Sequence, residues 1–164
     1  MNKTITISAL IIFSIIGLAL WGRSNQAARP SETATDGKSS LVASEALYDF
    51  GTISMKNGLA DHIFKVTNPT DKDIEVKTVN TSCMCTTAYI ESASGEKGPF
   101  GMPGMGYVPP ANELIKASES RDIKVVYDPN AHGPAGVGSI DRFVDLTLAN
   151  GGTLRLEIKA VVTP

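Results

Sequence analysis

From residue 46 onward, apolar and polar positions alternate in short runs that are separated by turn residues. In the last run, Leu154, Leu156 and Ile158 alternate with charged residues. Such alternation places one side of a strand in a core and the other in water, which is typical of antiparallel sheets. Seven runs of this kind span residues 46–53, 62–68, 73–81, 85–90, 121–127, 142–148 and 153–162. The pattern predicts an all-β fold, an immunoglobulin-like antiparallel β-sandwich of about seven strands.

The stretch between the fourth and fifth runs has a different composition. It begins with a segment rich in Gly, Met and Pro (91–105), and we expect a long loop near 91–118. Loops of this length in compact domains are usually functional or disordered. Residues 111–117 (ANELIKA) are the one helical candidate, predicted as a short helix that caps an end of the sandwich.

The N-terminal residues form a separate apolar segment. Residues 5–21 are almost entirely apolar, and Lys3 is the only charge before them. A helix of this length spans about 26 Å, so residues 1–22 are expected to form a single transmembrane anchor. A cleaved signal peptide with Met1-Asn2-Lys3 as its positive region is the alternative.

Residues 23–45, rich in Ser, Thr and Ala, are expected to form a flexible linker to the folded domain at 46–164. Since either version of the N-terminal segment is an export signal, we expect this domain to lie outside the cell membrane. It would stay attached to the membrane by the anchor, or be secreted or periplasmic after cleavage.

Charge and motif content narrow the function classes. The formal net charge is −2, and the absence of a basic cluster argues against nucleic acid as a partner. The chain lacks a serine elbow, a phosphate-binding glycine loop and a recurring pair of carboxylates. The sequence therefore predicts that the protein is not an enzyme.

Cys83 and Cys85 are the strongest candidates for chemistry. In an extended strand their Cα atoms would lie about 6.5–7 Å apart, so a disulfide would need local bending of the chain. The same placement suits two thiolates that bind one soft metal ion, and Met102 and Met105 could add thioethers in a site for Cu(I). Three interpretations stay open: structural cysteines or a structural disulfide, a copper site, and a redox-active pair.

The two histidines are weaker candidates. His62 alternates with Phe64 and Val66, which favours a structural role on that face of the strand. His132 lies in a turn-rich loop at 130–134, where we expect it to be solvated, with a place in a metal site as the alternative.

Several segments in order resemble the bacterial domain of unknown function 1573. They are residues 48–53 (YDFGTI), 64–68 (FKVTN), 81–86 (TSCMCT) and 125–129 (VVYDP), followed by the closing strand. The resemblance covers about residues 46–162 and implies an exported or membrane-anchored protein with an immunoglobulin-like fold of the hydin type. The family has no settled activity. Met84 stands where the family usually has Gly, and the long insertion after Ile90 is atypical.

The leading hypothesis is a non-enzymatic binding or scaffold domain without a cofactor. It would be tethered to the membrane, with a protein partner at an edge of a sheet. One alternative is a Cu(I)-binding protein that uses Cys83 and Cys85 with Met102 and Met105. The other is thiol–disulfide exchange through Cys83-Met84-Cys85.

Overall fold

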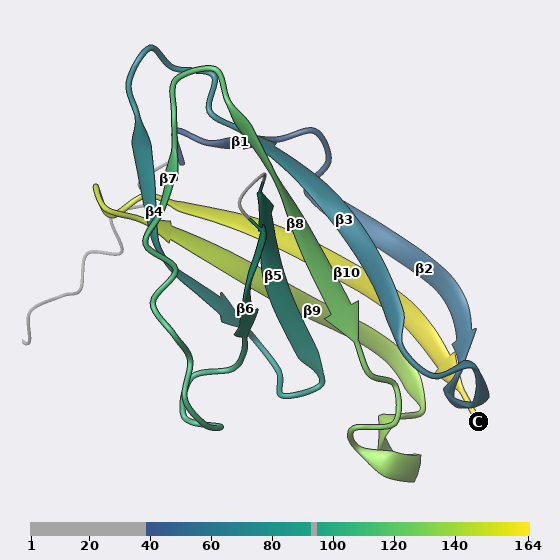
Figure 1. Cartoon of the computed structure of the whole chain (residues 1–164). Coiled ribbons are helices and arrows are strands. Elements are labelled where there is room, and N and C mark those ends of the chain that lie inside the picture. Colours follow the sequence, from purple (N-terminus) through teal and green to yellow (C-terminus); the bar gives the residue numbers. More distant parts are fainter. Residues whose placement is uncertain (1–38, 93–94) are drawn as a thin grey trace, which may run out of the picture. The chain divides into compact units, whose positions relative to one another are not determined.

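The structure is a computed structural model that describes residues 39–92 and 95–164. These residues hold ten strands in two five-stranded sheets (Figure 1). The strands are β1 (Val42–Ala43), β2 (Leu47–Ser54), β3 (Ala60–Thr67), β4 (Ile74–Thr81), β5 (Thr86–Ser92), β6 (Gly95–Phe100), β7 (Glu113–Ile115), β8 (Ser120–Tyr127), β9 (Gly138–Leu148) and β10 (Thr153–Thr163). Two short 3-10 turns, η1 (Met55–Asn57) and η2 (Gly133–Gly136), follow β2 and β8.

The transmembrane helix and most of the linker were predicted for residues that the structure does not describe. The expected transmembrane helix at 1–22 and the linker up to residue 38 lie outside the described residues. Within the described residues, no helix has the length and apolar character needed to cross a membrane. The end of the expected linker takes part in the sandwich, because β1 pairs with β3 and Leu41 is buried in the core.

The two sheets have the orders β1-β3-β8-β5-β6 and β2-β10-β9-β4-β7. Alternate apolar side chains fill the space between them, including Phe64 and Val66 of β3 and Leu156 and Ile158 of β10. The all-β sandwich predicted from the alternation is therefore confirmed. The pairing is not antiparallel throughout, because β2 runs parallel to β10. The chain leaves β2 for β3 in the other sheet, so no hairpin forces β2 and β10 to run in opposite directions.

Three strands were not expected from the sequence. β1, β6 and β7 are all edge strands, and β6 and β7 both lie within the stretch expected to be a long loop near 91–118. The predicted helix at 111–117 is wrong, because Glu113–Ile115 pair with Ile74–Val76 of β4. A strand of three residues is too short to show an alternation in the sequence, and its pairing with β4 provides the hydrogen bonds.

A partly buried ion cluster joins the edges of the two sheets. Glu113 of β7 is almost fully buried, and its carboxylate accepts hydrogen bonds from Lys97 of β6 and from Arg121 Nε of β8, the latter at 2.7 Å. Burial by itself would raise the pKa of Glu113, but the hydrogen bonds from Lys97 and Arg121 outweigh it. The pKa of Glu113 therefore lies below its ordinary value of 4.5.

Replacing Glu113 is expected to destabilise the fold in a pH-dependent way. At pH 7, Glu113→Gln removes charge-assisted hydrogen bonds and should lower the free energy of unfolding by about 2 kcal/mol. Because the pKa of Glu113 is lower in the folded than in the unfolded protein, its contribution is complete above pH 4.5 and is lost as the pH falls through the folded pKa. Urea unfolding at pH 7 and at pH 3 should show the wild type and the variant converging at the lower pH.

Glu119→Gln is the matched control for this prediction. Glu119 also pairs with Arg121, at 3.2 Å, but its side chain is 43% exposed. Exposed pairs contribute less than about 1 kcal/mol, so this variant should be close to wild type. A difference between Glu113→Gln and wild type that is as large at pH 3 as at pH 7 would contradict the assignment.

Candidate functional site

Cys83 and Cys85 form a disulfide in the connection between β4 and β5. This connection carries the chain from one sheet to the other, so the chain bends between β4 and β5. The bend brings the two Cα atoms to 5.2 Å. That separation lies inside the usual range for disulfides of roughly 4.4–6.8 Å. The spacing of an extended strand does not apply here, because the local bending that a bond requires is present.

Hydrogen bonds from both ends of the connection hold this bend. The Thr81 hydroxyl donates to the Cys83 carbonyl oxygen at 3.0 Å, and the Thr86 backbone N–H donates to the same oxygen at 3.1 Å. Ser82 exchanges two hydrogen bonds with the backbone of Phe143 on β9, each at 2.9 Å. Hydrogen bonds from Thr81 and Thr86 therefore fix the backbone at Cys83, and Ser82 holds the connection against β9.

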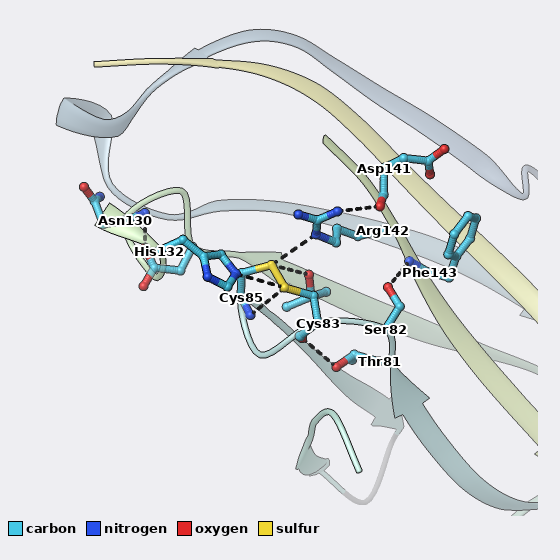
Figure 2. Close-up of a disulfide and its surroundings, with 11 residues drawn as sticks. Thr81, Ser82, Cys83, Cys85, Asn130, His132, Asp141, Arg142 and Phe143 are labelled. Carbon is cyan, nitrogen blue, oxygen red and sulfur yellow. Dashed lines mark hydrogen bonds between the residues drawn. A yellow bond between two sulfur atoms is a disulfide. The ribbon is translucent and has the colours of Figure 1, made fainter. Parts of the chain in front are cut away.

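The two sulfur atoms have different surroundings (Figure 2). Cys83 is half-buried, and its Sγ lies 3.2 Å from Nε2 of His132. Cys85 is only 2% exposed, and its Sγ accepts a hydrogen bond from Nε of Arg142 at 3.3 Å. The accessible sulfur thus has an imidazole beside it, and the buried sulfur has a guanidinium.

His132 is positioned by the connection between β8 and β9, which lies at the same end of the sandwich as the connection between β4 and β5 (Figure 1). The Asp128 backbone N–H donates to the Cys85 carbonyl oxygen at 2.8 Å, which attaches this connection to the disulfide. The Asp128 side chain accepts from Asn130 N, and the Gly133 backbone N–H donates to the Asn130 carbonyl oxygen. The His132 side chain is exposed, as expected from the sequence, but the expectation missed its contact with Cys83.

Arg142 was not identified from the sequence. It lies on β9 at a position that alternates with the buried Ile140 and Val144, so a charged residue occupies the face that points toward the core. A charged residue at an alternating, otherwise apolar position of a strand is the sequence signal that could have identified Arg142. Nearby, burial raises the pKa of Tyr127, and Asp128 raises it further, while the charge of Arg142 acts in the opposite direction.

A pocket of about 290 Å³ lies between the η2 segment and β9, beside His132 and Arg142. Both side chains that contact the sulfurs line it, and its full lining is His132, Ala135, Gly136, Val137, Ser139, Ile140 and Arg142. The pocket gives a partner or a small thiol a place beside these two side chains.

The other candidate residues are Met102, Met105 and His62. Met102 and Met105 belong to the connection between β6 and β7, where Met105 N donates to the Met102 carbonyl oxygen. Their role as metal ligands stays a prediction. His62 stacks on Tyr48 at 3.6 Å between ring centroids and contacts Glu45 Oε1 at 2.7 Å, so it belongs to a cluster on β2 and β3.

The chain is similar to one protein family and to several solved structures. The family described as "Protein of unknown function (DUF1573)" matches residues 41–102. No curated protein matches the chain. A protein of unknown function from Porphyromonas gingivalis W83 is similar in structure, with 16% identity and a TM-score of 0.54, over 82% of this chain and 51% of that one. A family 123 glycoside hydrolase from Clostridium perfringens has 7% identity and a TM-score of 0.52, over 72% of this chain and 23% of that one.

These structural similarities concern the fold alone. The chain spans about half the length of the Porphyromonas gingivalis protein and less than a quarter of the hydrolase. The match of the family includes the Cys83-Met84-Cys85 segment, which carried the resemblance in the sequence. The match thereby confirms the resemblance to the family of unknown function DUF1573 over residues 41–102.

Proposed function

We propose that this chain is an extracytoplasmic β-sandwich module that exchanges disulfides with a thiol-bearing partner protein through Cys83 and Cys85. The observation that carries the proposal is the difference between the two sulfurs. Cys83 is half-buried beside His132, whereas Cys85 is buried and accepts a hydrogen bond from Arg142. Exchange needs one sulfur that a thiolate can reach and another that leaves with negative charge.

The reaction begins at Cys83, the less buried of the two cysteines. A thiol of the partner loses its proton to the imidazole of His132, and the thiolate attacks Cys83 Sγ. The bond between the two cysteines breaks, and Cys85 Sγ leaves with the electron pair. The Arg142 Nε–H, 3.3 Å away, donates to this new thiolate and stabilises its charge.

A second thiol of the partner completes the exchange. It loses its proton and attacks the partner's own sulfur in the mixed disulfide, and Cys83 leaves as a thiolate that takes up that proton. The Cys85 thiolate takes up the proton held by His132. The partner dithiol has then lost two electrons and two protons, and the pair in this chain has gained both. The reverse sequence oxidises the pair again.

The location in this proposal is supported by two features. Disulfides persist mainly in oxidising compartments outside the cytoplasm. The apolar N-terminal segment is typical of an export signal or a membrane anchor. A membrane tether would hold the module near partners in the same compartment. A binding role at a sheet edge, the leading hypothesis from the sequence, stays a prediction and is compatible with exchange, which also requires a protein partner.

The proposal is tested by equilibrating the full chain, purified in a non-ionic detergent, with glutathione redox buffers. Thiol alkylation and mass measurement should show a reversible two-electron transition while circular dichroism shows the protein to be folded. The Cys83→Ser/Cys85→Ser variant is the control and should show none. A pair that becomes reducible only when the protein is unfolded would show a structural disulfide and overturn the proposal.

The rate of reduction by dithiothreitol gives a second readout in the same experiment. Arg142→Met removes the donor to Cys85 and should slow reduction about tenfold, since a hydrogen bond to a charged group contributes about 1.5 kcal/mol. Arg155→Met is the matched control, because Arg155 lies on β10 and pairs with Asp145. Equal rates for both variants would show that Arg142 does not stabilise the leaving sulfur.

A further inference from the structure

We infer that the reduced protein binds one Cu(I) ion through Cys83, Cys85 and His132. The two sulfurs and a ring nitrogen of His132 all lie within 4.8 Å of one another. The inference goes beyond the proposed function and requires only that the disulfide is reduced. It does not require a partner protein.

The distances between these atoms fit three ligands around one ion. Metal–ligand bonds of roughly 2.0–2.3 Å place three ligands in a plane about 3.5–4 Å apart. Cys83 Sγ and His132 Nε2 are already 3.2 Å apart. Once the bond between the sulfurs is broken, the Cα separation of 5.2 Å leaves room for both sulfurs to face one ion.

The charges favour a monovalent soft ion. Two thiolates carry two negative charges, and the guanidinium of Arg142 at Cys85 offsets one of them. With a monovalent ion, the two thiolates, the Arg142 guanidinium and the ion together carry no net charge. With a divalent ion, the same set carries a net positive charge. Thiolates select soft ions such as Cu(I), and imidazole is also a common copper ligand.

A structural zinc site fits less well. Such sites have four protein ligands in tetrahedral geometry. Within residues 39–92 and 95–164, the group of cysteine, histidine and carboxylate ligands at this place consists of Cys83, Cys85 and His132. His132 joins the two cysteines in this ligand set, whereas the copper site expected from the sequence joined them to Met102 and Met105.

Binding depends on the redox state of the pair. A dithiol reductant delivers two electrons and two protons, which convert the disulfide to two thiols. Cu(I) then displaces the two thiol protons and binds the thiolates, which are the form of cysteine that ligates metals. In the oxidised protein the sulfurs are bonded to each other, so the thiolate ligands are missing.

The test uses the full chain in detergent, reduced with dithiothreitol, freed of reductant and kept under anaerobic conditions. Titration with Cu(I) against a coloured Cu(I) chelator should show one equivalent bound by the reduced wild type and none by the oxidised protein. His132→Ala should weaken binding at least tenfold, whereas His62→Ala, the matched control, should bind as wild type does.

Two results would overturn the inference. One is reduced wild-type protein that binds no Cu(I), and the other is a His132→Ala variant with unchanged affinity. Because the cysteines are reduced chemically before the titration, either result leaves the glutathione experiment unaffected. A pair that resists glutathione but binds Cu(I) after dithiothreitol would reject the exchange proposal and support the copper site.

Discussion

The thiol of Cys83 in a Cys85→Ser variant is expected to react with an aromatic disulfide reagent about tenfold faster than the thiol of Cys85 in Cys83→Ser. The reason is access, because Cys83 is half-buried at the surface and Cys85 is 2% exposed. Arg142 favours the thiolate of Cys85 through its hydrogen bond, which would act in the opposite direction. The expected order therefore tests whether burial or charge controls the first step of exchange.

The measurement is the absorbance of the released aromatic thiol, followed at pH 7 with each variant of the full chain in detergent. The same reaction in concentrated urea is the control, since both thiols are then accessible and should react at similar rates. The reverse order in the folded protein would place the attack at Cys85 and contradict the direction of exchange that we propose.

Asn68→Ala is expected to lower the free energy of unfolding by about 3 kcal/mol. Asn68 is fully buried at the turn after β3. Its side-chain amide donates to the carbonyl oxygens of Lys72, Ile115 and Lys116 at 2.7–3.2 Å, and its oxygen accepts from the backbone and hydroxyl of Thr70. Alanine would leave buried backbone oxygens without this donor, which costs more than the loss of an exposed hydrogen bond.

Equilibrium urea unfolding at pH 7 measures this effect. Asn130→Ala is the matched control, because Asn130 is exposed and its side-chain amide donates to one backbone oxygen, that of Met55, at 2.9 Å. This variant should lose less than about 1 kcal/mol. Similar losses in the two variants would mean that Asn68 does not hold the β3–β4 turn and β7 together as described.

Some residues of the site could be predicted from the sequence to lie together, and others could not. Cys83 and Cys85 are close in the sequence, so their proximity in space follows from the spacing. The contacts that His132 and Arg142 make with the cysteine sulfurs do not follow from the sequence. His132 is 49 positions from Cys83, and Arg142 is 57 positions from Cys85. Only the packing of the β8–β9 connection and of β9 against the β4–β5 connection brings them to the sulfurs.

The sequence by itself determined the strands with a long alternation. Burying one face of a strand places buried side chains at every second position, as at the end of β3, in β8 and in β10. In β4 a bulge after Val76 shifts the buried positions to Val79 and Thr81. Tertiary structure alone decided features that depend on partners distant in the chain. The three residues of β7 form a strand because β4 lies beside them, and β2 runs parallel to β10 because the chain crosses between the sheets. The disulfide has the same cause, since the bend that joins Cys83 to Cys85 arises where the chain passes from one sheet to the other.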